Sequence, residues 1–109
     1  MEFDHVALQV PDIGAAVDWF LETIEGAEIR YQDATWALVE AGGTKLAFVV
    51  SDQHPSHIAW RVSGRQLANL ARTHGEEVRT HRDATQSFYL TAPGGHCVEL
   101  ISYPEEPSL

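Results

Sequence analysis

HVALQV (residues 5–10) and HIAWRV (residues 57–62) each begin with a histidine and continue as a strand-like run of mostly apolar residues. A third strand-like run, HCVELIS (residues 96–102), carries a glutamate near its centre. Imidazole nitrogens and carboxylate oxygens are common metal ligands in proteins. The three runs therefore predict strands that present a candidate metal-binding trio, which consists of His5, His57 and Glu99.

The two histidines occupy equivalent points of an internal repeat. The shift from His5 to His57 is 52 positions, and the glycine pair at 42–43 recurs 52 positions later at 94–95. A period of about 50 residues predicts two copies of one module, and neither copy is large enough to bury much of a core alone. The copies are therefore expected to fold against each other or against another chain. Two further matches support the repeat: GAEIR (26–30) with GEEVR (75–79), and DAT (33–35) with DAT (83–85).

Each half of the chain predicts a strand, a helix and then three strands, which is an α+β fold. The first helix is expected between Asp12, its N-cap, and Gly26, its C-terminal cap. The second helix, over residues 65–74, is expected to end at Gly75. Strands are expected near 3–10, 27–32, 35–41, 45–50, 57–62, 76–80, 87–92 and 96–103. The prediction is one domain over 1–109, built from two βαβββ modules at about 1–51 and 56–103, with a frayed tail at 104–109.

Composition narrows the functional classes. The formal net charge of -9 opposes binding to nucleic acid or to an anionic membrane surface. No segment approaches the roughly 18 unbroken apolar residues of a membrane span, and the N-terminus lacks the features of a signal peptide, so a cytoplasmic location is expected. The single cysteine, Cys97, excludes an internal disulfide and a cysteine-based zinc finger.

Alternation along the strands predicts which side chains share a face. The face expected to lie under the helices carries Val6, Leu8, Val10, Ile58, Trp60, Val62, Val98 and Leu100. The opposite face carries His5, Gln9, His57, Arg61 and Glu99. A histidine and a glutamate buried there without partners would each cost several kcal/mol, so this second face is expected to line a cleft.

The chain resembles the vicinal oxygen chelate superfamily, which comprises the glyoxalases, bleomycin-resistance proteins and extradiol dioxygenases. DHVALQV (4–10), APGGHCVEL (92–100) and the paired modules carry the resemblance. It implies a glyoxalase-like fold, in which the two modules form a curved mixed sheet around a cleft. The family's four ligand positions correspond here to His5, Ala47, His57 and Glu99. The methyl group of Ala47 cannot bind a metal or move a proton, which disfavours a typical glyoxalase I.

The resemblance implies one divalent metal per site, with manganese, iron, zinc and nickel all open. A His-His-Glu trio leaves positions for two substrate oxygens. The implied enzyme binds two oxygens of a small substrate and stabilises an oxyanion or enolate, with Glu99 or Tyr89 as the acid-base group. A lyase or isomerase, a dioxygenase and a fosfomycin-type thiol transferase all remain open.

Other residues are expected to face the cleft and bind substrate: Gln9, Lys45, Arg61 and, by resemblance to the Ser-Phe-Tyr stretch of fosfomycin thiol transferases, Ser87 beside Tyr89. Each also has an ordinary alternative. Lys45 is an exposed strand lysine under that alternative, and Arg61 pairs with an acid. A pair between Arg61 and Glu99 would leave an empty cleft.

A binding protein without chemistry is the rival hypothesis. Bleomycin-sequestering relatives hold a cationic drug in an acidic, aromatic cleft, and this chain offers its negative charge with Phe3, Trp36 and Trp60. The partner is in either case a small molecule. A homodimer with two equivalent sites is expected. The modules would pair within one chain or be exchanged, so that His5 of one subunit meets His57 and Glu99 of another.

Overall fold

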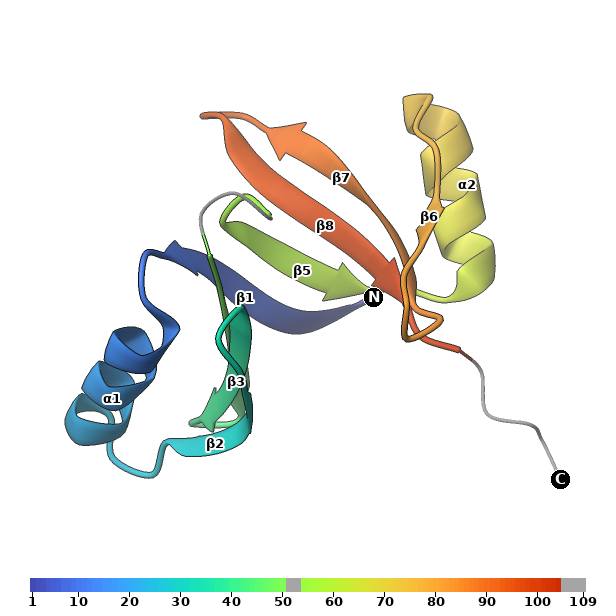
Figure 1. Ribbon diagram of the computed structural model, residues 1–109. Coiled ribbons are helices and arrows are strands. Elements are labelled where there is room, and N and C mark those ends of the chain that lie inside the picture. Colours follow the sequence, from blue (N-terminus) through green and yellow to red (C-terminus); the bar gives the residue numbers. More distant parts are fainter. Residues whose placement is uncertain (51–53, 105–109) are drawn as a thin grey trace, which may run out of the picture. The chain divides into compact units, whose positions relative to one another are not determined.

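The structure is a computed structural model that describes residues 1–50 and 54–104. Two helices and one eight-stranded mixed sheet make up the described chain, which confirms the predicted α+β class (Figure 1). The elements follow the order β1 (Glu2–Val10), α1 (Ile13–Thr23), β2 (Glu28–Gln32), β3 (Trp36–Ala41), β4 (Thr44–Val50), β5 (His57–Arg61), α2 (Gly64–His74), β6 (Arg79–Thr80), β7 (Gln86–Ala92) and β8 (His96–Ser102). The order of elements along the chain is the expected strand-helix-three-strand module, twice. The strand order in the sheet is β2-β3-β4-β1-β5-β8-β7-β6.

Contacts divide the chain into two compact units. The N-terminal unit is Asp4–Ile58, and the C-terminal unit joins Met1–Phe3 to Ala59–Leu109. The module limits expected at about 1–51 and 56–103 stay predictions. Residues 51–53 and 105–109, the latter most of the expected tail, lie outside the described residues. No helix of the described chain has the length and apolar character needed to cross a membrane.

The core of the N-terminal unit lies between α1 and strands β3 and β4. Asp12 caps α1 as expected, because its side chain accepts a hydrogen bond from the Ala15 amide at 3.0 Å. The expected C-terminal cap at Gly26 is wrong, since Ile24 ends the helix with its amide bonded to the Phe20 carbonyl. Gly26 has φ 83° and follows in the turn. The buried core consists of Ile13, Val17, Ala37, Val39 and Phe48, with Leu8 and Val10 packed against it.

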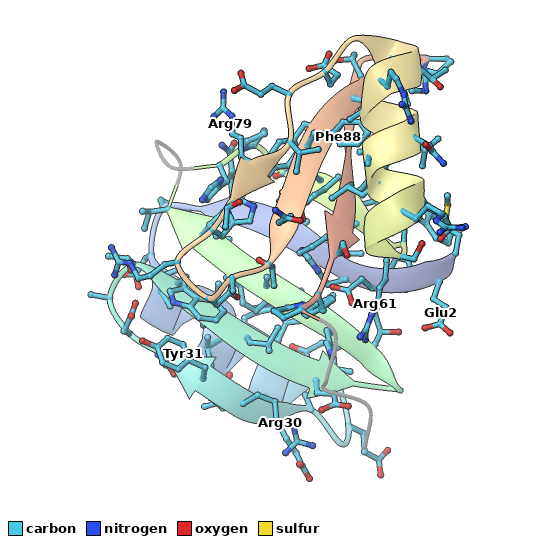
Figure 2. The ribbon with its side chains drawn as sticks, turned by 90° about the vertical axis from the view of Figure 1, so that its right-hand side faces the viewer. Glu2, Arg30, Tyr31, Arg61, Arg79 and Phe88 are labelled. Atoms are coloured by element: carbon cyan, nitrogen blue, oxygen red, sulfur yellow. The ribbon has the colours of Figure 1, made fainter. Side chains whose placement is uncertain are left out.

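The core of the C-terminal unit lies between α2 and strands β7 and β8, where Phe88 is one of the buried residues (Figure 2). Ser63 and Gln66 form a capping box at the start of α2, and Gly75 ends it in the left-handed conformation, as expected. Two side chains expected under the helix are not covered: Ile58 is 43% exposed and Trp60 is 36% exposed. The Trp60 ring instead lies edge-on to Phe3, with centroids 5.6 Å apart.

The repeated DAT sequence builds the same hydrogen bonds in both units. Asp33 accepts from the Thr35 amide at 2.7 Å and from its hydroxyl at 2.8 Å. Asp83 accepts from the Thr85 amide at 3.0 Å and from its hydroxyl at 2.6 Å. These bonds lower the pKa of both aspartates, and at Asp33 the largest cause is a further bond from the Tyr31 hydroxyl. The repeat in sequence is therefore also a repeat of local structure.

Asp33 is expected to make the stability of the protein depend on pH at acid pH. Its lowered pKa contributes stability above the ordinary pKa of about 4, and that contribution is lost as pH falls through the lowered value. An Asp33→Asn variant should therefore have a lower Tm than wild type at pH 7, and the difference between the two Tm values should shrink as pH falls below about 4. Thermal unfolding across this range measures the difference, and a constant difference at every pH would contradict the assignment.

Candidate metal site

His5 and His57 stand on two neighbouring strands of the sheet. His5 lies on β1 and His57 on β5, and these strands are adjacent in the strand order. The two imidazole rings meet edge to face, with centroids 5.5 Å apart and an interplanar angle of 73°. His57 is buried and His5 is half-buried. The N-terminal unit alone therefore brings together the two histidines that the repeat in sequence singles out.

Hydrogen bonds orient both imidazoles in the same sense. His57 Nδ1 lies 2.8 Å from the Pro55 carbonyl oxygen, and His5 Nδ1 lies 2.6 Å from Asp4 Oδ2. A carbonyl or an ionised carboxylate only accepts, so Nδ1 carries the proton and donates in each pair. The lone pair of each ring is therefore on Nε2. Metal-binding histidines have this arrangement, with one nitrogen on the ion and the other N–H on a carbonyl or carboxylate.

The donor set fits a divalent metal. A cation bonded to two imidazoles at about 2.1 Å with a tetrahedral angle would separate their ring centroids by roughly 5 Å, close to the observed spacing. Glu99 is the third candidate ligand that the sequence predicts. Two nitrogens and one carboxylate suit iron, zinc, manganese or nickel, so the donor set does not select among them.

Glu99 lies in the C-terminal unit, on β8, with only 4% of its surface exposed. Tyr89 is its cross-strand partner on β7, and the Tyr89 hydroxyl donates a hydrogen bond to the Glu99 carboxylate. Burial, the negative charge of Glu99 and this hydrogen bond, in that order, raise the pKa of Tyr89 far above its ordinary value. Tyr89 is therefore a protonated donor at neutral pH and not a base. Burial and Glu99 also raise the pKa of the Cys97 thiol, which stays protonated.

Ser87 shares the Tyr89 face of β7 and is 1% exposed. Its hydroxyl lies 2.6 Å from Nε2 of His81, a half-buried residue before β7. His81 lies in a loop, where residue spacing predicts no site role. The turn that folds His81 back is visible only in the structure, where its amide bonds to the Thr85 carbonyl at 2.8 Å. The recurrence of DAT at 83–85 was the one sequence signal for that turn.

Gln9 and Lys45 lie in the N-terminal unit on β1 and β4. The Gln9 amide donates to Ser56 Oγ at 2.9 Å, and its side chain donates to the His54 carbonyl, so Gln9 holds the segment before β5 in place. Lys45 is exposed and lies in register with His5 on one side and Glu40 on the other. The charge of Lys45 contributes to the lowered pKa of Glu40, behind the larger effect of Arg30. The substrate-binding roles of Gln9 and Lys45 stay predictions.

Arg61 lies at the end of β5 (Figure 2). Its guanidinium stacks on the Tyr103 ring, with 4.4 Å from Cζ to the ring centroid. A cleft of about 950 Å³ adjoins this pair in the C-terminal unit, lined also by Ser63 and Gly64 at the start of α2 and by Ser102. The structure thus gives Arg61 a stacking partner from the segment after β8. Its role as a substrate anchor stays a prediction.

Solved structures of known proteins share this fold. No protein-family model and no curated protein matches the sequence. A hypothetical protein from Bacillus halodurans matches with a TM-score of 0.74 at 15% identity, over 99% of this chain and 98% of that one. A variant of Streptomyces coelicolor methylmalonyl-CoA epimerase, in complex with 2-nitronate-propionyl-CoA, matches with a TM-score of 0.71 at 18% identity, over 98% of this chain and 99% of that one.

A glyoxalase/bleomycin resistance protein/dioxygenase superfamily member from Vibrio splendidus matches with a TM-score of 0.67 at 12% identity, over 90% of this chain and 95% of that one. The chain therefore shares the fold of this superfamily member and of methylmalonyl-CoA epimerase. This likeness confirms the glyoxalase-like fold expected from the two strand motifs and the paired modules. At these identities the likeness establishes the fold, and activity has to be argued from the residues of the site.

Tyr89 is expected to titrate later than an ordinary tyrosine. Its raised pKa means that the neutral phenol is favoured in the folded state, so its contribution to stability is complete below about pH 10 and is lost as pH rises through the raised value. Tyr89→Phe should therefore lose less stability than wild type above about pH 10. Ultraviolet titration of the three tyrosines, with Tyr103→Phe as the matched control, should assign the highest pKa to Tyr89. An ordinary pKa for Tyr89 would contradict its bond to Glu99.

Proposed function

We propose that this protein is a small enzyme that binds one divalent metal through His5, His57 and Glu99. The observation that carries the proposal is the matched orientation of the two histidines, each with Nδ1 donating a hydrogen bond and the ring lone pair on Nε2. Glu99, which the sequence places with the two histidines, is the third proposed ligand.

Three protein ligands leave coordination positions for two oxygens of a small substrate. A divalent ion, when bound, supplies positive charge that stabilises an oxyanion or enolate. Ala47, at the family's fourth ligand position, is in register with Ala7 and Leu38 on the neighbouring strands. These apolar side chains supply no fourth ligand.

The chain's own residues suit proton transfer to or from carbon or oxygen beside this site. Tyr89 is a protonated hydroxyl that donates a hydrogen bond, and Glu99 is a buried carboxylate that can accept a proton. The reaction class that we propose is therefore proton abstraction next to a carbonyl group, with Glu99 as acceptor and Tyr89 as donor. Lyases and isomerases both use this step.

Coenzyme A thioesters are the first substrates to test. Streptomyces coelicolor methylmalonyl-CoA epimerase, which shares the fold, has been crystallised with 2-nitronate-propionyl-CoA. A thioester offers a carbonyl oxygen and an acidic α-proton, which the proposed chemistry requires. Exchange of that proton with deuterated water, followed by NMR, detects abstraction even where no net product forms. Exchange in the metal-loaded protein that disappears in Glu99→Gln is the expected result.

A non-catalytic binding protein is the second candidate, supported by exposed aromatic side chains in the N-terminal unit. Tyr31 and Trp36 stack with centroids 4.5 Å apart and an interplanar angle of 24°, and both are exposed. With a net charge of -9, such a platform suits a cationic aromatic ligand. Stabilisation by such a ligand without metal, together with no proton exchange, would favour this candidate.

The assembly that we propose is a cytoplasmic homodimer with one site per chain. β1 and β5 of a single chain are sheet neighbours, so His5 and His57 come together without exchange of modules between subunits. Exposed Ile58 and Trp60 on β5 are available for burial in such a dimer. Light scattering of the purified protein measures the mass directly.

Metal content is expected to follow the three proposed ligands. Protein purified without chelator should carry about one divalent ion per chain, because three oriented ligands bind such ions tightly. His5→Ala and Glu99→Gln should each lose most of that ion. His74→Ala, at the exposed end of α2, is the matched control and should keep it. Elemental analysis gives the stoichiometry and the identity of the metal. Equal content in all four proteins would eliminate the site.

A further inference from the structure

We propose that Asp4 is a positioning residue that fixes His5 for metal binding. The inference rests on the proposed function and deepens it, because it concerns how this chain prepares one of its ligands. Asp4 holds the Nδ1 proton of His5 and so directs the Nε2 lone pair at the ion. Asp4 itself touches neither metal nor substrate.

The carboxylate of Asp4 is buried. Its side chain is 4% exposed, and among the described residues Asp4 and Glu99 are the two buried acids. Burial of an ionised carboxylate is costly unless hydrogen bonds compensate for the lost water. The 2.6 Å contact between Asp4 Oδ2 and His5 Nδ1 provides one such bond. A buried acid at this position therefore has a specific structural reason.

The contact is not a by-product of strand geometry. Neighbouring side chains of a regular strand leave opposite faces, so residues 4 and 5 would ordinarily point apart. The parallel register between β1 and β4 begins at His5, which pairs with Lys45, and Asp4 precedes this pair. The Asp4 side chain meets the His5 ring at this edge of the regular pairing.

In the second copy of the repeat, the histidine is oriented by a different kind of acceptor. His57 is oriented by the neutral carbonyl of Pro55, and the repeat-equivalent of Asp4 is Ser56, whose hydroxyl accepts from the Gln9 amide. Nδ1 of His5 therefore has a negatively charged acceptor, whereas Nδ1 of His57 has a neutral one. A carboxylate there makes the imidazole a more basic ligand than a carbonyl does, and loss of such partners typically weakens metal binding about 10- to 100-fold.

Two variants and one control separate the role of the carboxylate from a general effect of charge. Asp4→Asn keeps the shape and removes the charge, and Asp4→Ala removes the hydrogen-bond acceptor. Asp18→Asn removes the same charge from an exposed position of α1 in the same unit. Calorimetric titration with Zn²⁺ and with Mn²⁺ gives the dissociation constants. NMR of the imidazole nitrogens in metal-free protein gives the tautomer of each histidine.

The expected results are a metal affinity about 10- to 100-fold weaker in Asp4→Asn and unchanged in Asp18→Asn. Metal-free wild type should hold His5 with the proton on Nδ1, and Asp4→Ala should shift it to Nε2 while His57 keeps its proton on Nδ1. Asp4→Glu, which restores a carboxylate, should recover part of the affinity. A merely structural role for Asp4 would leave the tautomer of a folded variant unchanged.

The outcomes distinguish this inference from the function on which it rests. Wild type that binds neither ion overturns the proposed function and the inference with it. Wild type that binds metal, with Asp4→Asn within twofold of it, overturns the inference and leaves the function standing. Should the Asp4 variants fail to fold, the wild-type spectrum decides, because a proton on Nε2 of His5 in metal-free protein contradicts the role of Asp4.

Discussion

Polar side chains buried on a strand face must find partners there, and this constraint shapes the whole candidate site. Asp4, His57, Ser87 and Glu99 all lie in such positions. Among the described residues, no buried side-chain nitrogen or oxygen lacks a hydrogen-bond partner. Unpaired polar groups would oppose folding, so the partners are as necessary to the structure as the apolar cores beneath the helices. The same partners set the orientation of the proposed ligands.

The two copies of the module agree where backbone geometry is concerned and differ where chemistry is concerned. In both DAT turns the aspartate side chain accepts hydrogen bonds from the amide and the hydroxyl of the threonine two residues later. The helices begin alike, on Asp12 and on Ser63, yet only the second has a left-handed glycine cap. On the opposite faces the copies diverge, because one contributes Ala47 and the other Glu99 at corresponding points. The duplicated scaffold therefore carries an asymmetric set of proposed metal ligands.

Much of the architecture could be predicted from the sequence, since strand alternation and helical spacing are local properties of the chain. The α+β class, the Asp12 cap and the Gly75 cap follow from such local signals and are confirmed. Prediction was wrong where burial depends on other elements. Ile58 and Trp60 have the alternation of covered residues, but both are exposed, and α2 packs on β7 and β8.

By itself the sequence determined the repeat, the order of the elements and the three side chains that could bind a metal, because these depend on residue type and spacing. The tertiary structure alone decided how those side chains are held. The bond from Tyr89 to Glu99 depends on the register between β7 and β8, and the bonds from His5 to Asp4 and from His57 to Pro55 depend on the local conformation of backbone and side chains. A hydrogen bond requires an alignment of atoms within a few tenths of an ångström, and residue spacing cannot specify that.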